Sequence, residues 1–500
     1  MAMLPNLLRT KSITSEIPSD GHGLKRVLGS TDLIMLGIGG IVGAGIFALV
    51  GTAAAGDETR PGAGPALVIS FVLTAVACGF AALCYAEFAS LANVSGSAYS
   101  YAYATLGELV AWIIGWDLIL EYAVGNVAVA VSWSGYLQVL LHGFGIDFPK
   151  WIATDFRAAL DDPAIMASAP RLFGVPIIFN LPAVFIVTAL TALLVVGVKE
   201  SAWFNTIMVG IKLVVLAFFM IIGMFYIKPE HWHPFMPNGW QGVQAGAAVV
   251  FFAFIGFDAV STAAEECRNP KRDLPIGILG SLGICTVIYM LVAVVLTGMY
   301  PWSKLNTAEP LSMAMRAVNQ DWAAGVVAFG SVIAHTAVLL VFQLGQPRIL
   351  YAMSRDGLLP RAMSRVHPRF RTPHVATILT GLFVAGASAL ASLDEMADLC
   401  NIGTLSAFVI VCAGVLVLRW RDPHRRTGFR TPWVPLVPIL GIASCFWLML
   451  GLPTVAWVRF MVWLIVGLVF YVSYGFWRRR CQAREIGKPA EPELLGETRS

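Results

Sequence analysis

Two stretches rich in glycine and phenylalanine carry the residues whose spacing could bind a small ligand. The first reads GIGGIVGAGIF over residues 37–47, and the second reads FFAFIGFD over residues 251–258. Each lies in an apolar run long enough to cross a membrane, where glycine weakens a helix and frees peptide groups from their partners. In lipid, a freed N–H or C=O is costly unless something satisfies it. The two stretches therefore predict a binding site made of backbone, in which a ligand supplies the missing partners.

The glycines of the first stretch allow two other interpretations. Five glycines in nine positions, 37–45, resemble a dinucleotide-binding fingerprint. No strand precedes them and no soluble domain surrounds them, so we reject a nucleotide site. Gly39 and Gly43 also fit a motif for close packing of helices. The second stretch, at residues 251–258, favours a binding site over packing alone.

Lys212 is a basic residue deep inside an apolar run. It lies about nine residues from the inner end of a predicted span, and at about 1.5 Å per residue this is roughly 13 Å from that end. This depth strains the reach of a lysine toward water, and burial disfavours its charged form. We therefore expect Lys212 to bind and release a proton. The alternative is a static lysine bonded to carbonyls of the broken first helix.

Among the ionisable residues inside predicted spans, three carboxylates and one histidine are candidates for the site. Asp117 and Glu121 are four residues apart and share one helix face. Glu121 lies deeper, and it either shares a proton pathway with Lys212 or lines a water cavity. Asp258 follows the second break, where we expect it to cap the lower half-helix. His335 is the one histidine away from the ends of a predicted span, and it is either a satisfied core residue or a ligand contact.

Composition identifies a polytopic membrane protein. Of 500 residues, 57% are hydrophobic and 13% are charged, and the mean hydropathy is +0.74. The net charge of +4 is too small to indicate a nucleic-acid partner. The eight cysteines form no CxxC pair, so they predict neither a metal site nor a disulfide framework. No combination of nucleophile and base is found, and we expect neither an enzyme nor a cofactor.

Apolar windows predict an all-α fold with twelve transmembrane helices. Their ranges are 32–55, 64–92, 108–141, 177–198, 203–227, 241–265, 275–299, 322–351, 374–392, 397–419, 432–452 and 454–477. Lysine and arginine concentrate at residues 348–371, 419–430 and 478–484, which places both termini in the cytoplasm. The expected tails are residues 1–27 and 478–500.

The membrane domain, residues 28–477, divides into two sets of five spans and a remainder. Residues 28–227 and 241–419 each begin with a broken helix. Because five is odd, the second set enters the membrane from the opposite side, which predicts an inverted repeat with a site near the midplane. Two extra helices over residues 432–477 lie outside the repeat.

Four segments resemble a known family. They are GGIVGAGIFALVG (39–51), GWDLILEYAVG (115–125), FFAFIGFDAVSTAAEECRNPKRDLP (251–275) and QPRILYAMSRDGLLP (346–360). They resemble the amino acid–polyamine–organocation superfamily and, within it, the bacterial proton-coupled members of the cationic amino acid transporter family. The resemblance implies the LeuT fold, with twelve helices and a five-plus-five inverted repeat, and it implies amino acid transport.

The resemblance also assigns roles to residues of both breaks. The half-helix after Gly43 begins with free N–H groups and the positive end of a helix dipole, which suits a carboxylate. By resemblance, the N–H groups of Ala44 and Gly45 hold the carboxylate of an amino acid. The carbonyls that take its amine are those of Ile41, Phe252, Ala253 and Ile255.

Four side chains complete the site that the resemblance implies. Phe252 matches the aromatic residue that covers the substrate from outside. Lys212 fills the place where sodium-coupled relatives bind an ion, which argues against sodium and for a proton as the coupling ion. Glu121 matches an acidic residue that the family keeps on its third helix. His335 lies on the eighth helix, where members of the family tune the side-chain pocket.

We therefore expect an importer of a small neutral amino acid, such as alanine, that works by proton symport and alternating access in a bacterial inner membrane. The alternatives are a transporter of arginine or lysine, an amino acid exchanger, and a sensor that does not transport. A channel is disfavoured because no repeated ring of polar residues is found. The expected partners are the amino acid and the lipid bilayer. The sequence leaves open a small membrane partner protein and the choice between monomer and homodimer.

Overall fold

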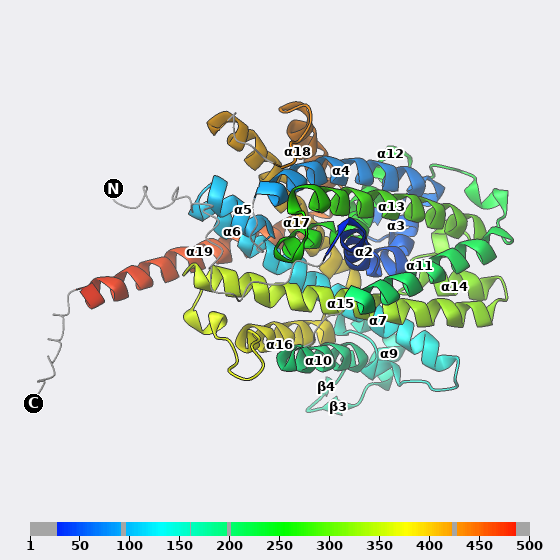
Figure 1. Ribbon diagram of the computed structural model, residues 1–500. Coiled ribbons are helices and arrows are strands. Elements are labelled where there is room, and N and C mark those ends of the chain that lie inside the picture. Colours follow the sequence, from blue (N-terminus) through cyan, green and yellow to red (C-terminus); the bar gives the residue numbers. More distant parts are fainter. Residues whose placement is uncertain (1–27, 92–96, 161, 198–201, 423–427, 487–500) are drawn as a thin grey trace, which may run out of the picture.

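The computed structural model describes residues 28–91, 97–160, 162–197, 202–422 and 428–486. The predicted tail of residues 1–27 and the last residues, 487–500, lie outside the described residues. Long helices pack side by side along one direction, and helix α19 extends beyond the bundle at one end (Figure 1). That helix spans Thr454–Ile486, so it continues into the segment predicted as a C-terminal tail.

Both predicted breaks are present. The first helix consists of α2 (Ser30–Ile41), a π-helix η1 (Gly45–Leu49) and α3 (Val50–Ala55), with a bend of 48° between its two parts. The other broken helix consists of α12 (Gly239–Val250) and two 3-10 segments, η6 (Phe251–Phe254) and η7 (Phe257–Glu266). Glycine and the resulting loss of regular α-helix therefore coincide in both stretches.

The remaining helices follow the predicted order. The longer ones are α4 (Leu67–Leu91), α6 (Glu108–Ile119), η3 (Leu120–Val124), α7 (Gly125–His142), α10 (Leu181–Val196), α11 (Ala202–Met224), α13 (Pro270–Met299), α15 (Asp321–Arg355), α16 (His374–Leu390), α17 (Leu393–Arg421) and α18 (Leu436–Met449). The shorter ones are η2 (Gly64–Ala66), α5 (Ser97–Thr105), η4 (Lys150–Ile152), α8 (Phe156–Leu160), α9 (Pro163–Ser168), η5 (Pro229–Trp232), η8 (Trp302–Lys304), α14 (Pro310–Ala317) and η9 (Arg361–Ser364).

Strands are confined to two small hairpins. Strands β1 (Gly56–Asp57) and β2 (Arg60–Pro61) pair antiparallel directly after α3. Strands β3 (Arg171–Leu172) and β4 (Val175–Pro176) form a second antiparallel pair in the connection from α7 to α10. The fold of the described residues is therefore almost entirely helical.

Length and composition support fewer spans than the sequence predicts. Within the described residues, eight helices are long and apolar enough to cross a membrane, and the bent pair from α2 to α3 makes a ninth. Three shorter apolar helices, α10, α16 and α18, lie where three further spans are predicted. The count of twelve spans and the inverted repeat stay predictions.

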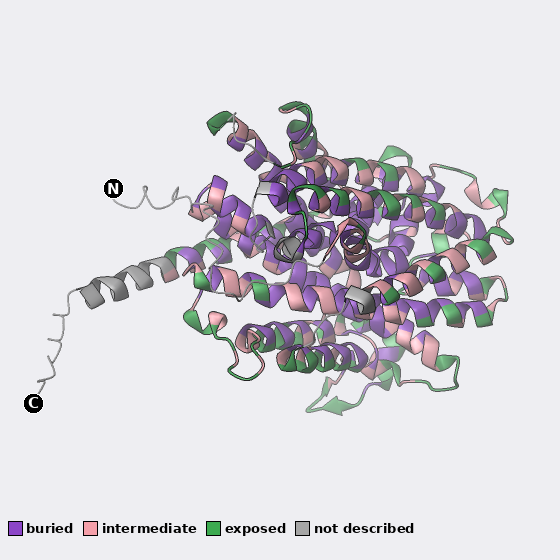
Figure 2. Ribbon diagram, viewed as in Figure 1, coloured by how far each residue is buried: buried purple, intermediate pink, exposed green. Residues whose placement is uncertain are grey.

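Burial separates a central core from an apolar outer surface. The residues of η1 are all buried, and buried positions gather in the interior of the bundle (Figure 2). On the outside, large apolar side chains remain exposed, including Ile465, Val469 and Val472 of α19. An apolar surface of this extent is what a lipid bilayer covers. The two breaks therefore lie in the centre of the protein, away from the lipid-facing surface.

Candidate functional site

The two broken helices touch each other through backbone. A Cβ atom added to Gly45 would overlap the Cα of Ala253, so η1 and η6 approach as closely as glycine allows. On the other side of the break, a Cβ at Gly40 would lie 3.2 Å from the carbonyl oxygen of Gly256. The glycines at these positions are therefore required by close approach, and the two predicted halves of the site do meet.

The half-helix after the first break offers N–H groups at its N-terminus. The N–H groups of Ile46 and Phe47 both donate to the carbonyl of Gly43, at 3.2 Å each. The N–H groups at the start of a helix have no acceptor within that helix. Among the described residues, no backbone hydrogen bond between segments starts from Ala44 or Gly45. This end of the half-helix is positive, so it can bind a carboxylate as expected.

The helix before the first break, α2, offers carbonyls at its C-terminal end, and side chains from other helices cover them. The carbonyl of Ile38 accepts from Val42 N–H at 3.0 Å. Lys212 Nζ, from α11, donates to the carbonyl oxygens of Gly39 at 2.7 Å and of Val42 at 3.1 Å. An ammonium group at the negative end of a helix is favourable. Lys212 therefore caps α2 from another helix, and it is fully buried.

These contacts of Lys212 are the ones expected of a lysine bonded to carbonyls of the broken helix. They are equally compatible with a lysine that binds and releases a proton, so its coupling role stays a prediction. No hydrogen bond or ion pair joins Lys212 to Glu121, although the structure describes both side chains.

Tyr289 is a site residue that the sequence analysis missed. Its hydroxyl, from α13, donates to the carbonyl of Ile41 at 3.1 Å. Ile41 was predicted to receive the amine of a substrate, and one of its two lone pairs is thus already engaged. A buried tyrosine hydroxyl usually needs a partner, so a lone tyrosine within the apolar span 275–299 was the available signal.

The second break is closed largely by its own backbone. The N–H of Ile255 donates to the carbonyl of Phe252 at 3.3 Å, and the N–H of Ala259 donates to the carbonyl of Gly256 at 3.2 Å. Gly256 has φ = +112°, a conformation that favours glycine. Phe252, Ala253 and Ile255 are buried, and Ala253 lies against Gly45 of the first break. The carbonyl of Phe252 already accepts one bond, and the role of these residues in binding substrate stays a prediction.

The buried carboxylates lie deeper in the interior. Glu121 belongs to the π-helix η3, an irregularity often found at functional sites. Its carboxyl group and that of Asp258 are both buried. Asp258 lies in the first turn of η7, where a negative charge suits a helix N-terminus. Its carboxylate makes no hydrogen bond to the described residues there, so the predicted cap is not found. Asp117 is also buried, and neither of its carboxylate oxygens has a hydrogen-bond partner.

His335 is fully buried and fixed on both ring nitrogens. Its Nδ1 lies 2.6 Å from the carbonyl oxygen of Ser331, and its Nε2 lies 2.7 Å from Ser132 Oγ. A carbonyl only accepts, so Nδ1 carries the hydrogen and Nε2 accepts from the Ser132 hydroxyl. The ring also packs near Phe47 of η1, at a centroid distance of 5.8 Å. This environment is that of a satisfied core histidine at the edge of the break.

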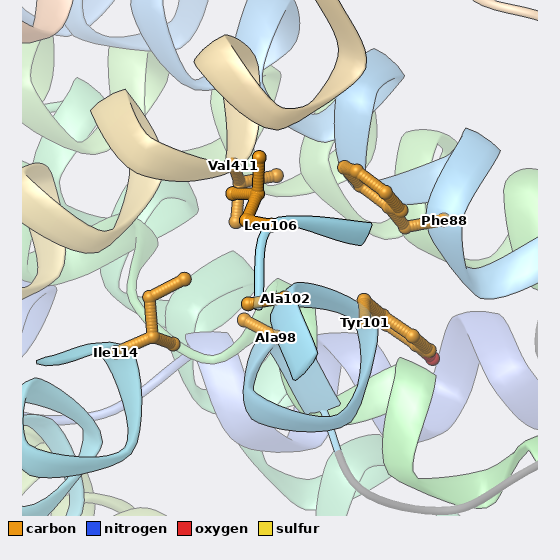
Figure 3. Close-up of a pocket in the computed structure, with 7 residues that line it drawn as sticks. All are labelled: Phe88, Ala98, Tyr101, Ala102, Leu106, Ile114 and Val411. Carbon is orange, nitrogen blue, oxygen red and sulfur yellow. The ribbon is translucent and has the colours of Figure 1, made fainter. Parts of the chain in front are cut away.

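A separate small cavity lies between α4, α5, α6 and α17. Its lining residues are Phe88, Ala98, Tyr101, Ala102, Leu106, Ile114 and Val411 (Figure 3). Apart from the tyrosine hydroxyl, these side chains are apolar. The cavity contains none of the residues predicted to bind substrate, so it is distinct from the contact between the two breaks.

Comparison with known proteins covers nearly the whole chain. The amino acid permease family matches residues 28–472. A branched-chain amino acid permease of Bacillus subtilis (strain 168) is 49% identical over 475 residues, which cover 94% of this chain and 98% of that protein. The methylthioribose transporter of the same organism is 46% identical over 472 residues, with coverage of 94% and 98%.

More distant similarity reaches eukaryotic proteins. The vacuolar cationic amino acid transporter 4 of Arabidopsis thaliana is 38% identical over 427 residues, which cover 84% of this chain and 68% of that protein. These relatives are permeases and transporters rather than enzymes, and they agree with the resemblance drawn from the four sequence segments. The chain belongs to the amino acid permease family of multi-pass membrane transporters, within the amino acid–polyamine–organocation superfamily.

Proposed function

We propose that the protein takes up a neutral amino acid across the cytoplasmic membrane by proton symport. The observation that carries the proposal is the contact between the two breaks, at Gly45 with Ala253 and at Gly40 with Gly256. One break presents the positive end of a half-helix, and both breaks present backbone carbonyls. A zwitterion has a carboxylate for the first and an ammonium for the second.

The membrane arrangement of the proposal is the one expected from the sequence. Twelve spans in a LeuT-like fold, with a five-plus-five inverted repeat, bring the two broken helices together near the midplane. Both termini are cytoplasmic, and the bilayer is the inner membrane of a bacterium. Alternating access moves the elements around the fixed site, so the substrate passes from outside to inside.

Lys212 carries the coupled proton in this proposal. Its ammonium donates to Gly39 and Val42, at the negative end of α2. Loss of the proton removes the charge that favours this helix terminus, so α2 is held less firmly and can move. Glu121, a buried carboxyl on the π-helix η3, is the second candidate for the proton path. Because the lysine serves as the cation at this position, sodium is not required.

The substrate is a neutral amino acid, with a small one favoured. Apolar side chains border the break, including Val338, which a Cβ at Gly43 would approach to 2.8 Å. Both nitrogens of His335 are bonded within the protein, so this residue offers no anionic partner to arginine or lysine. The relative that is 49% identical is a branched-chain amino acid permease, which extends the expected range from alanine to valine and leucine.

A second candidate substrate comes from the relative described as a methylthioribose transporter, which is 46% identical. A thiosugar has neither the carboxylate nor the ammonium that the two breaks match. It would therefore have to use hydroxyl groups at the same backbone. Arginine and lysine remain the third candidate class. Burying their side-chain charge without a partner is costly, so their binding would require a carboxylate of the protein to pair with that charge.

Uptake into proteoliposomes tests the proposal. We expect an imposed pH gradient, acidic outside, to drive accumulation of labelled alanine or valine above its external concentration. Uptake that needs preloaded amino acid and does not respond to the pH gradient would indicate an exchanger. Binding with no flux would indicate a sensor.

Competition by unlabelled alanine, leucine, arginine and methylthioribose separates the substrate classes. We expect alanine and leucine to compete and the other two to compete weakly. If His335 bounds the pocket, His335→Ala should admit larger side chains while small ones bind more weakly. Strong competition by arginine in the unmutated protein would overturn the neutral assignment, and an unchanged ranking in the variant would remove His335 from the pocket.

A further inference from the structure

One face of α13 packs along α2 and directs Tyr289 at the first break. Small residues repeat every four positions before it: a Cβ at Gly277 would lie 2.7 Å from Leu33 Cβ, and a Cβ at Gly37 would lie 2.6 Å from Ser281 Cβ. Residues four apart share a helix face, so the next positions of this series are 285 and 289. The close packing of the small residues brings Tyr289 to the C-terminal end of α2.

Tyr289 contacts both breaks. Its hydroxyl donates to Ile41 at 3.1 Å, and its ring centroid lies 5.5 Å from that of Phe254 in η6. A second aromatic contact, at 5.6 Å, joins it to Phe71 of α4. The tyrosine is fully buried, so the position of its ring is set by packing on two sides. Its hydroxyl can therefore occupy only a narrow region beside the break.

The carbonyls at the end of α2 have different partners. Ile38 accepts from backbone, while Gly39 and Val42 accept from a lysine ammonium. Ile41 accepts from a neutral hydroxyl, which forms a weaker hydrogen bond than a charged group does. Ile41 is also the carbonyl of this break that is expected to receive the substrate's ammonium. Of the three carbonyls that side chains cover, the one that accepts from a neutral group is thus also the expected ammonium acceptor.

We infer that the Tyr289 hydroxyl is a place-holder for the ammonium of the substrate, an inference that rests on the proposed function. In the empty site, the hydroxyl satisfies the Ile41 carbonyl, which would otherwise be buried without a partner. When an amino acid binds, its ammonium replaces this bond with a charge-assisted one. Tyr289 thereby stabilises the empty protein and lowers the affinity for substrate.

The inference predicts that removal of the Tyr289 hydroxyl raises the affinity for substrate. Removal of a direct ligand would lower the affinity, and a purely structural residue would not raise it. Tyr289→Phe keeps the ring and its packing but removes the hydroxyl, so the Ile41 carbonyl of the empty site loses its partner. The bound state loses nothing, because the ammonium takes the carbonyl. We expect the Kd for alanine or valine to fall by about tenfold. The empty variant should melt at a lower temperature, and saturating amino acid should raise its Tm by more than in the unmutated protein.

Tyr136→Phe is the matched control. Tyr136 is also fully buried, and its hydroxyl also donates to a carbonyl of the first broken helix, that of Phe47. Phe47 is not expected to bind the ammonium, so this variant should lose thermal stability without gaining affinity. Isothermal titration with alanine and valine on the three purified proteins gives the comparison.

Each outcome decides between the place-holder and its alternatives. A Kd of Tyr289→Phe that is unchanged or raised, in an unmutated protein that does bind, overturns the place-holder alone. No binding of any amino acid by the unmutated protein overturns the proposed function and the place-holder with it. A gain in affinity of equal size in Tyr136→Phe also overturns the place-holder, because general loosening would then explain the effect.

A second measurement applies even if Tyr289→Phe does not fold. Incorporation of 3-fluorotyrosine at position 289 retains the hydroxyl and reports its surroundings by fluorine NMR. Addition of valine should move the fluorine resonance, because the hydroxyl exchanges its partner. A resonance that stays in place at saturating valine overturns the inference.

Discussion

The two broken helices satisfy their freed backbone in different ways. In the first break, side chains from α11 and α13 cover the carbonyls of Gly39, Ile41 and Val42. In the second break, two 3-10 segments close on themselves through bonds from Ile255 and Ala259. Side chains thus cover the carbonyls of the first break itself. At the second break, the described side chains of α17 and α4 reach only the end of α12, at Ala248 and Ala247, and the 3-10 segments after it bond locally.

This difference predicts different roles for the two breaks. A side chain can leave a carbonyl when a proton or a ligand replaces it, without loss of the helix that it caps. A 3-10 turn can release its carbonyls only by changing backbone conformation. We therefore expect binding and coupling to respond most to residues that cover the first break, and folding stability to respond most to the glycine of the second.

The largest expected effect comes from Gly45→Val, which separates the two breaks. Its Cβ would overlap Ala253, so the branched side chain fills the space where the helices meet. We expect amino acid affinity to fall by at least ~100-fold, measured by isothermal titration. Gly79→Val is the control, because nothing lies within 4 Å of a Cβ at Gly79. A folded Gly45→Val protein with unchanged affinity for amino acids would contradict the assignment of the site.

The next effect concerns the lysine that covers the first break. Lys212→Met removes the ammonium from Gly39 and Val42 but leaves the N–H groups of the carboxylate site. We expect binding to persist, weakened by about tenfold or less, and proton-driven accumulation in proteoliposomes to disappear. The exposed Lys304→Met serves as the control. Uptake by Lys212→Met that still follows the pH gradient would show that another residue carries the coupled proton, and Glu121 is the next candidate.

The second break should respond in stability rather than in coupling. Gly256 has φ = +112°, and a Cβ there would lie 2.8 Å from the carbonyl of Gly40. We expect Gly256→Ala to lower the free energy of unfolding by about 1–3 kcal/mol, seen as a lower Tm. Gly283→Ala, on an open face of α13, is the control. Equal stability of Gly256→Ala and the unmutated protein would show that the second break is not held by its own backbone.

The smallest expected effect lies just after the C-terminal end of the first broken helix. Asp57 pairs with Arg60 at 2.8 Å, and Arg60 pairs with Asp398 at 2.6 Å. Burial opposes ionisation of Asp57, but Arg60 and hydrogen bonds from Thr59 outweigh it and hold the pKa of this carboxyl below its usual value of 3.8. Its contribution to stability is therefore present above that value and is lost as the pH falls through the lower folded pKa.

Asp57→Asn tests this sign. The variant should melt below the unmutated protein at pH 7, and the difference should shrink toward pH 3, as measured by thermal unfolding in detergent. The exposed Glu58→Gln should show no such dependence. A difference in Tm that grows as the pH falls would contradict the pairing of Asp57 with Arg60.

The sequence predicted the positions of both breaks because glycine within an apolar run has a local physical meaning. Lys212 could be predicted at the first break because a buried lysine needs acceptors, and a broken helix supplies them. The partner of Tyr289 could not be predicted, since the hydroxyl and the Ile41 carbonyl are 248 residues apart. The same holds for His335, whose partner Ser132 lies 203 residues away on a neighbouring helix.

A structure of the protein with a bound amino acid, determined by cryo-electron microscopy, tests the central claim most directly. The account predicts the carboxylate at the N–H groups of Ala44 and Gly45, and the ammonium at the carbonyl of Ile41 and those of the second break. The Tyr289 hydroxyl should have left the Ile41 carbonyl. Amino acid density in the cavity lined by Phe88 and Tyr101, with no density at the two breaks, would contradict the account.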